Sequence, residues 1–245
     1  FEVAKSPRQI YGAFDRLLGP ERAADFWRQY RDSYVTEDDI RFIKSVGFNM
    51  VRVPLHYRLF MTADGEISGE GWALLDRVVG WAAAAGLYVI PDLHAAPGGQ
   101  TGINHDDGPG YPLMFYVPRD RDLTVKLWRA VAQRYSGNPT ILGYDILNEP
   151  IAPYHDVATL NARLEPFYKR ATAAIRDVDP ERIVIWNKAI FDEFSRGEIP
   201  KDPHFTRTAI PAVYVTALGK GAARIRARAG DIRDPFIVLQ GDKDY

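Results

Sequence analysis

Segments in which apolar residues recur at helical spacing alternate, over three quarters of the chain, with short runs that are apolar almost throughout. The helical spacing predicts helices at about 36–46, 72–85, 123–135 and 157–178. The apolar runs predict strands at about 49–54, 87–93, 141–147 and 182–186. Strands this uniformly apolar fit a parallel sheet with both faces covered.

The predicted helix boundaries follow known end signals. Thr36 is a suitable N-cap, and the acidic run 37–39 occupies the first turn, where the helix dipole favours anions. Gly47 and Gly86 each stand where a helix gives way to a strand, which is the usual place for a C-terminal glycine.

Polar or aromatic residues stand at the carboxyl ends of four successive predicted strands: His56, His94, Glu149 and Trp186. An open doubly wound sheet spreads such ends along a crevice, whereas a barrel gathers them around one mouth. We therefore predict an α/β fold of the (β/α)8 TIM-barrel type, either partial or atypical in its C-terminal part.

The remainder, 187–245, has a different character. Residues 191–205 are polar and rich in turn formers, and strands at 212–218 and 236–240 flank a basic helix at 221–229. With no clear linker, we predict one catalytic domain over 1–245, barrel-like in 1–186 and atypical in 187–245.

Composition narrows the classes of partner. At 245 residues and 46% hydrophobic content, the chain can bury a large core. A net charge of −1 gives no reason to expect nucleic acid or an anionic membrane, and no apolar run is long enough to span a bilayer. Without cysteine, disulfides and thiolate metal sites are excluded. Because the chain opens at Phe1 within domain-like sequence, we expect a fragment or processed product, and secretion remains open.

The run 141–150 carries the strongest chemical signal. An apolar stretch ends abruptly in Asn148, Glu149 and Pro150, and proline cannot donate to a sheet ladder. Glu149 is thus presented at a strand tip beside an amide, as a candidate proton donor.

Several motifs, in order and at similar spacing, resemble glycoside hydrolase family 5, the cellulase family. They are Val35-Thr36-Glu37-Asp38-Asp39-Ile40, Phe48-Asn49-Met50-Val51-Arg52-Val53-Pro54, Pro91-Asp92-Leu93-His94 with the following Ala-Ala-Pro-Gly-Gly-Gln, and Leu147-Asn148-Glu149-Pro150. The resemblance extends over about 1–186. It implies an eight-stranded barrel that cleaves β-linked glucans, mannans and related glycosides with retention of configuration.

The same resemblance implies roles for individual residues. Glu149 would be the acid/base, Asn148 would bind the 2-hydroxyl of the sugar at the cleavage point, and His94 would contact that sugar. Arg52 would lie near the nucleophile and keep it ionised. Two carboxylates suffice for this chemistry, so no cofactor and no metal are expected, and the partner is a polysaccharide or oligosaccharide.

Other readings of these residues remain open. Arg52 fits a buried ion pair equally well, and Trp186 fits either sugar stacking or core filling. His56 and His105 fit structural or surface roles better than metal ligation, since neither has a second ligand close in sequence. The Gly- and Asp-rich loop 98–117 fits a substrate subsite.

The chain departs from the family pattern at the second carboxylate that a retaining enzyme needs. Past Trp186 the only glutamates are Glu193 and Glu198, neither of which closes an apolar run. The family's first strand would precede Phe1, and His204 is followed by Phe205 and Thr206 instead of the family's His-x-Tyr.

Two alternatives follow. The first is a carbohydrate-binding fragment or pseudoenzyme without a nucleophile. The second is an α/β-hydrolase esterase, because 232–244 resembles the acid-bearing strand of those enzymes, with Asp244 as the triad acid. No serine of the chain sits in a Gly-x-Ser-x-Gly elbow, however. Asp242 and Asp244 join Glu193 and Glu198 as candidates for the missing carboxylate.

Overall fold

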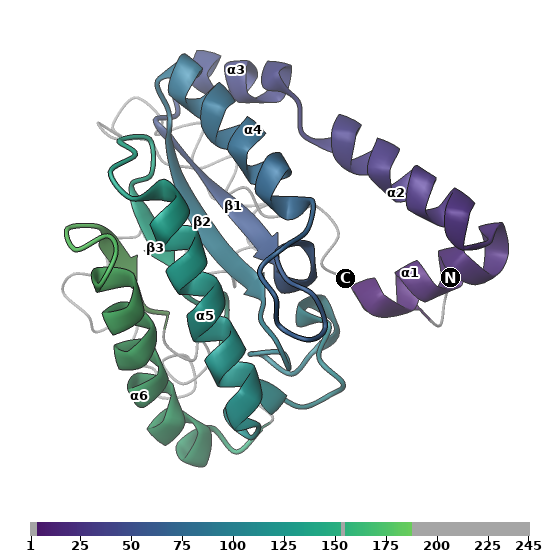
Figure 1. Ribbon diagram of the computed structural model, residues 1–245, viewed down its shortest axis with the longest axis vertical. Helices are drawn as coiled ribbons and strands as arrows, with labels where there is room; N and C mark the ends of the chain where they lie inside the picture. Colours follow the sequence, from purple (N-terminus) through teal and green to yellow (C-terminus); the bar gives the residue numbers. More distant parts are fainter. Residues whose placement is uncertain (1–3, 153–154, 188–245) are drawn as a thin grey trace, which may run out of the picture.

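The computed structural model describes residues 4–152 and 155–187, whose centre is a parallel sheet (Figure 1). Its four strands lie in the order β1-β2-β3-β4, with neighbours parallel to one another. Their bounds are β1 Met50–His56, β2 Tyr88–Ala95, β3 Gly143–Asp145 and β4 Ile183–Ile185. Each strand therefore pairs with the next one in the sequence, as in the wall of a barrel.

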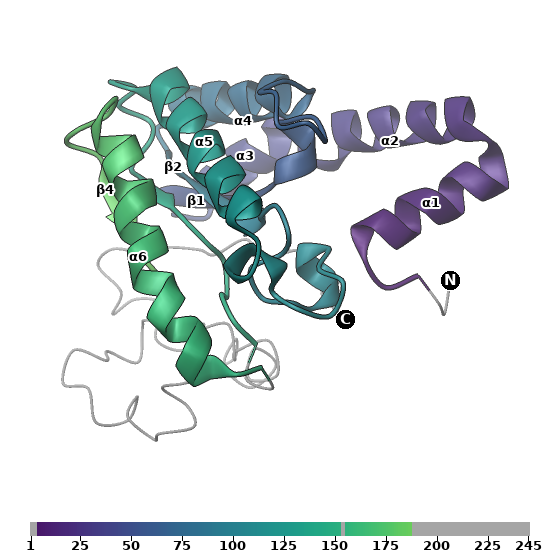
Figure 2. The same ribbon diagram turned by 60° about the horizontal axis from the view of Figure 1, so that its bottom comes forward.

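The crossover helices lie along one face of this sheet (Figures 1 and 2). They are α4 (Gly71–Ala85), α5 (Pro118–Tyr135) and α6 (Val157–Arg176). A doubly wound sheet would reverse its strand order and carry helices on both faces. Sequential order with helices on a single face instead matches the barrel type that the sequence predicts.

The two faces of the sheet differ in chemistry, because successive strand residues point to opposite sides. The helix-covered face carries apolar residues such as Leu55, Leu93 and Ile146, all buried in the core. The other face carries the residues that alternate with these along each strand, among them Arg52, Asp92 and Asp145. The register that pairs Asp92 with Asp145 shows that the carboxylates of β2 and β3 share this second face.

The core lies between the sheet and its helices. Trp128 of α5 and Phe167 of α6 are among its largest fully buried side chains. The indole of Trp128 also donates a 3.0 Å hydrogen bond to the carbonyl of Ile146, so the polar atom of this buried aromatic is satisfied. This packing fixes the chain immediately before Asn148 and Glu149.

Three helices precede β1: α1 (Pro7–Leu18), α2 (Pro20–Tyr34) and α3 (Glu37–Ser45). The predicted N-cap is confirmed, since Thr36 and Asp39 form a capping box at the start of α3. Helices α1 and α2, which were not predicted, pair as a hairpin on one side of the sheet (Figure 2). Aromatic rings of this hairpin contact one another; those of Tyr11 and Trp27 meet edge to face, with 4.5 Å between their centroids.

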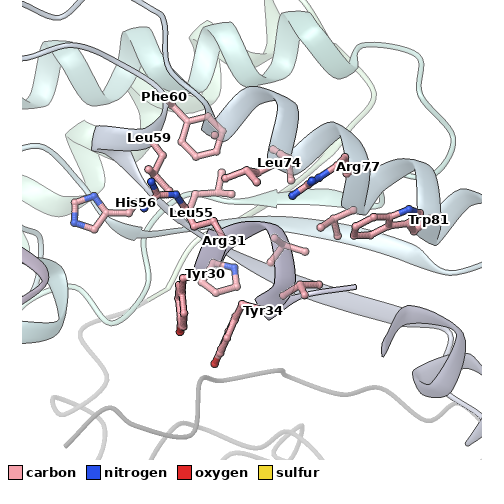
Figure 3. A pocket seen from close by; sticks show the side chains of 16 residues that line it. Tyr30, Arg31, Tyr34, Leu55, His56, Leu59, Phe60, Leu74, Arg77 and Trp81 are labelled. Atoms are coloured by element: carbon pink, nitrogen blue, oxygen red, sulfur yellow. The ribbon is translucent and has the colours of Figure 1, made fainter. Parts of the chain in front are cut away.

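A mainly apolar cavity of about 280 Å³ lies between α2, β1 and α4 (Figure 3). Tyr30, Leu55, Phe60 and Trp81 are among its lining residues. It opens on the helix side of β1, and its lining contains no carboxylate. This cavity is therefore distinct from the polar face of the sheet.

The predicted elements agree with the structure at most positions and differ at two. Helix α5 begins at Pro118 rather than near 123, and β3 spans 143–145 rather than 141–147. Backbone contacts with β2 continue on both sides of this strand, from the bridge between Val89 and Ile141 to the 3.0 Å hydrogen bond that the Asn148 nitrogen donates to the Leu93 carbonyl. The positive φ of Glu149, 40°, comes only after these contacts. The predicted features of 188–245 lie outside the described residues, and the single domain over 1–245 stays a prediction.

Candidate active site

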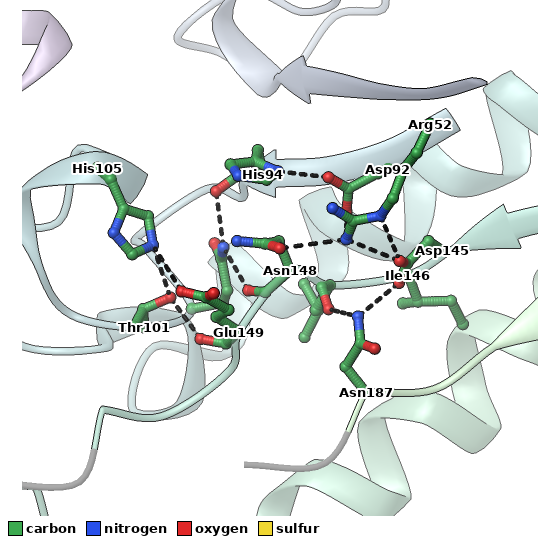
Figure 4. Close-up of polar contacts among 12 residues, drawn as sticks. Arg52, Asp92, His94, Thr101, His105, Asp145, Ile146, Asn148, Glu149 and Asn187 are labelled. Carbon is green, nitrogen blue, oxygen red and sulfur yellow. Dashed lines mark hydrogen bonds and ion pairs between the residues drawn. The ribbon is translucent and has the colours of Figure 1, made fainter. Parts of the chain in front are cut away.

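An ion cluster occupies the polar face of the sheet and centres on Arg52 of β1 (Figure 4). Its guanidinium lies 2.7 Å from Asp92 Oδ1 and 2.7 Å from Asp145 Oδ2. Its Nε donates a 2.9 Å hydrogen bond to Asp145, and its Nη2 donates one of 3.1 Å to Asn148 Oδ1. One side chain thus ties three neighbouring strands together.

His94 and Asn187 extend the cluster on either side. The Nδ1 of His94 bonds Asp92 Oδ2, which fixes the orientation of the imidazole ring. Asn187, just beyond β4, donates hydrogen bonds of 2.7 Å to Asp145 Oδ1 and 2.6 Å to the carbonyl of Leu147. The site therefore draws on all four described strands.

The surroundings of Asp145 disfavour its anionic form. Burial raises the pKa of Asp145 to about 7, and the charge of Asp92 adds to the rise, while Arg52 opposes it. Near neutral pH the Asp145 carboxyl group is therefore partly protonated. Both carboxylates are engaged by partners within the cluster, so neither is presented to a ligand in the way Glu149 is.

The segment that carries Asn148 and Glu149 is held by the loop after β2. The fully buried Gln100 donates from Nε2 to the carbonyls of His94 (2.7 Å) and Asn148 (2.9 Å). Its side-chain oxygen accepts from the nitrogen of Ala96 at 3.0 Å. One glutamine thus joins the end of β2 to the residue before Glu149, with no polar atom of its amide left idle.

Glu149 itself has a strained backbone, with φ of 40°. Thr101 holds this conformation by donating a 2.6 Å hydrogen bond from its hydroxyl to the Glu149 carbonyl. The carboxylate is 16% exposed, and its Oε2 lies 4.0 Å from Nε2 of His105. Strain that surrounding contacts maintain is typical of functional residues.

Asn148 presents a donor that no described residue satisfies. The residue is 5% exposed, and its Oδ1 accepts from Arg52. Its Nδ2 is buried and has no hydrogen-bond acceptor within the described ranges. Because a buried unpaired donor is costly, this amide is prepared to bind an oxygen supplied by a ligand.

The structure brings together four of the five residues that the sequence singled out: Arg52, His94, Asn148 and Glu149. Trp186 does not join them. Its indole stacks on Tyr168 of α6 at 5.2 Å and donates to Thr172 at 2.9 Å, on the helix side of the sheet. The sugar-stacking role for Trp186 stays untested, and its observed neighbours belong to α6.

Five further residues contact the Arg52 cluster or hold the Asn148–Glu149 segment, and none was given a role from the sequence: Asp92, Asp145, Gln100, Thr101 and Asn187. A signal was present for the aspartates. Each interrupts an otherwise apolar strand, and charge in a buried strand indicates a second polar face. Gln100 and Asn187 lie in loop-like sequence, where no periodicity shows which way a side chain points.

No group of three or more His, Asp or Glu side chains placed to hold a metal occurs in residues 4–152 and 155–187. In that same part of the chain, no helix combines the length and apolarity that crossing a bilayer requires. Glu193, Glu198, Asp242 and Asp244, the candidates for a second carboxylate, lie outside the described residues, as does the esterase-like segment 232–244.

Comparison with known proteins gives a consistent family. The chain is 37% identical over 207 residues to a β-xylosidase of Phanerodontia chrysosporium, covering 82% of this chain and 42% of that protein. It is 33% identical over 173 residues to a probable glucan 1,3-β-glucosidase A of Emericella nidulans, covering 69% of this chain and 41% of that relative. The chain therefore spans about two fifths of the length of these relatives.

Solved structures agree on the fold. A crystal structure of a glycoside hydrolase matches with a TM-score of 0.52 at 24% identity, covering 60% of this chain and 44% of that one. An endogalactoceramidase structure matches with a TM-score of 0.55 at 21% identity, covering 64% of this chain and 45% of that one. The family model described as cellulase (glycosyl hydrolase family 5) matches residues 19–213. This range begins and ends later than the 1–186 over which the motifs suggested the resemblance. This chain belongs to glycosyl hydrolase family 5.

Proposed function

We propose that the protein is a retaining glycoside hydrolase that cleaves β-linked glucan- or mannan-type polysaccharide or oligosaccharide, with Glu149 as its acid/base. The family assignment supports the reaction class, and the local geometry supports the role of Glu149. The carboxylate is largely shielded from solvent, and the hydroxyl of Thr101 holds the backbone carbonyl of the same residue.

The observation that carries the proposal is the Nδ2 of Asn148, next to Glu149, which has no hydrogen-bond acceptor among the residues that the structure describes. A sugar hydroxyl is an acceptor of the right kind for this amide, and it would complete the hydrogen bonding of a buried group. A sugar bound in this way has its glycosidic bond beside residue 149, which is the position a proton donor needs.

The remaining polar residues support that geometry. Arg52 holds the Asn148 side chain by its oxygen, which fixes which end of the amide faces the ligand. Asp92 fixes the ring of His94, so that this ring meets the substrate in one orientation. Glu149 would protonate the leaving oxygen in the first step and take a proton from water in the second.

The substrate class rests on the relatives and on the chemistry of the site. The compared proteins are named β-xylosidase and glucan 1,3-β-glucosidase, so β-1,3-glucan oligosaccharides and aryl β-xylosides are the first substrates to test. The polar face offers the amide of Asn148 and the imidazole of His94, groups that suit neutral sugar hydroxyls.

The second carboxylate of the proposed mechanism is not assigned. Retention requires a nucleophile about 5 Å from the acid/base. Asp92 and Asp145 are engaged with Arg52, and the sequence candidates Glu193, Glu198, Asp242 and Asp244 lie outside the described residues. Carbohydrate binding without hydrolysis is therefore the rival that an experiment must separate.

Replacing Glu149 by Gln tests the proposal. The amide has nearly the same shape but cannot donate a proton as an acid, so hydrolysis of unactivated β-glycosides should fall by at least about 10²-fold. Circular dichroism and oligosaccharide affinity, measured by calorimetry, should match those of the wild type. Unchanged turnover in the variant would reject the role of Glu149.

Carbohydrate binding without hydrolysis, the alternative to this proposal, predicts a different result for the wild-type protein. If the wild-type protein binds β-glucan oligosaccharides in calorimetry yet releases no reducing sugar, it is a binding module and the glycosidase proposal fails. Exposed Arg129, which pairs with Asp177 on the surface, offers a matched control: Arg129→Gln should leave both affinity and turnover unchanged.

A further inference from the structure

His105 lies close to the Glu149 carboxylate and has no role in the proposed function. It belongs to the loop after β2, and its Nε2 lies 4.0 Å from Glu149 Oε2. The two side chains are similarly shielded, at 15% and 16% exposure. Figure 4 shows Glu149 between His105 on one side and the Arg52 cluster on the other.

The tautomer of His105 follows from hydrogen counting at Thr101. The threonine hydroxyl has one hydrogen, and it goes to the Glu149 carbonyl in a 2.6 Å bond. The 3.4 Å contact between that hydroxyl oxygen and His105 Nε2 therefore needs its hydrogen from the imidazole. An N–H of His105 thus points into the space shared by Thr101 and the Glu149 carboxylate.

The loop that carries His105 is internally fixed. Asp106 is buried and accepts backbone hydrogen bonds from Thr101 (2.6 Å), Gly102 (2.8 Å) and Gly108 (2.8 Å). Asn104 donates a 2.8 Å hydrogen bond to the carbonyl of Lys5, which ties the loop to the segment before α1. The imidazole is consequently held close to the carboxylate by its backbone as well as by Thr101.

We propose that His105 is a positioning residue for the acid/base: its Nε2–H bonds one oxygen of the Glu149 carboxyl group and directs the other oxygen at the glycosidic bond. The inference rests on the proposed function. A distance of 4.0 Å is longer than a hydrogen bond, and catalytic hydrogen bonds commonly shorten only when substrate is bound.

The proton balance is simple. In the first step, the second carboxylate of the proposed mechanism attacks the anomeric carbon, the glycosidic C–O bond breaks, and the proton on Glu149 passes to the leaving oxygen. The Glu149 carboxylate that results accepts the hydrogen bond of His105. In the second step, this carboxylate takes a proton from water as the water attacks the anomeric carbon and releases the second carboxylate. His105 keeps its own proton throughout and acts only through Glu149.

The test uses kcat/KM for a series of aryl β-glycosides, measured in the protein at its natural length. Acid assistance matters for poor leaving groups such as phenol and little for good ones such as 2,4-dinitrophenol. We expect His105→Phe to lower kcat/KM about 10- to 100-fold for the phenyl substrate. It should leave the dinitrophenyl substrate close to wild type. His105→Gln, whose amide can place an N–H near the position of Nε2, should recover most of the loss.

Glu149→Gln, run in parallel, separates two kinds of failure. If it is steeply sensitive to the leaving group while His105→Phe is slowed equally on all substrates or not at all, the positioning role is wrong and the glycosidase stands. If Glu149→Gln shows no such sensitivity, the proposed function itself fails. A His105→Gln variant no better than His105→Phe would also overturn the positioning role.

Discussion

At the residue scale, the chemistry of this protein depends on side chains that hold other side chains. Gln100 contributes no reactive group, yet its amide joins the end of β2 to Asn148. Thr101 likewise holds the strained backbone of Glu149. Short motifs identified Asn148 and Glu149 from the sequence, whereas their supports stand in a loop where sequence gives no directional signal.

Asp145 gives a prediction at this scale. Its pKa is raised to about 7 from an ordinary 3.8, chiefly by burial and next by Asp92. The folded protein therefore keeps a proton on Asp145 that the unfolded chain releases as pH rises above about 4. The stabilising contribution is complete below that pH and is lost progressively as pH rises through about 7.

Urea unfolding of wild type and Asp145→Asn across pH 4 to 8 measures this effect. The free energy of unfolding of the wild type, relative to that of the variant, should fall as pH rises. A difference that stays constant or grows would contradict the raised pKa of Asp145. Burial also lowers the pKa of His56 to about 4, which gives an opposite slope, but that slope is common to both proteins and cancels. Asp92→Asn, which removes the neighbouring anion, should weaken the Asp145 effect.

At the element scale, caps and periodicity predicted most of the sheet and its crossover helices. Thr36 and Gly86 mark the ends of α3 and α4 as expected, the latter in the left-handed conformation with φ of 66°. Helix α5 starts early because Pro118 occupies its first turn, a position where proline is favoured and where the apolar periodicity has not yet begun. β3 is shorter than predicted, yet the hydrogen bond from the Asn148 nitrogen to the Leu93 carbonyl keeps the chain beside β2 up to the residue before Glu149.

Two glycine substitutions test how tightly the loop after β2 is built. Gly102 has φ of 82°, and a Cβ there would lie 2.6 Å from the backbone nitrogen of Pro112. Gly102→Ala should therefore destabilise the protein by at least about 1 kcal/mol. Glu149-dependent activity should also fall, because Gly102 adjoins Thr101.

Gly80, exposed in the interior of α4, is the matched control. A Cβ there meets no atom within 4 Å, so Gly80→Ala should stabilise the fold by about 0.5–1 kcal/mol through helix propensity alone. Thermal and urea unfolding report both values. Equal stability of Gly102→Ala and wild type would show that the loop is not constrained in this way.

At the scale of the whole molecule, the described residues form one wall of a barrel whose inner face is polar and whose outer face is apolar. The sequence predicted this class because alternating helices and apolar strands allow few arrangements. The sequence does not identify the second carboxylate, because neither Glu193 nor Glu198 closes an apolar run. Both residues also lie outside the part of the chain that the structure describes. The chain also spans only about two fifths of the relatives it matches.

The most direct test of the central claim, that Glu149 is the acid/base of a retaining hydrolase, is the product that Glu149→Ala forms with azide. Without its base, this variant should process dinitrophenyl β-glycosides slowly, because water cannot be activated to release the glycosyl–enzyme. Azide needs no base, so it should restore turnover and yield the β-glycosyl azide, identified by proton NMR. An α-glycosyl azide, or no azide product at all, would contradict the account.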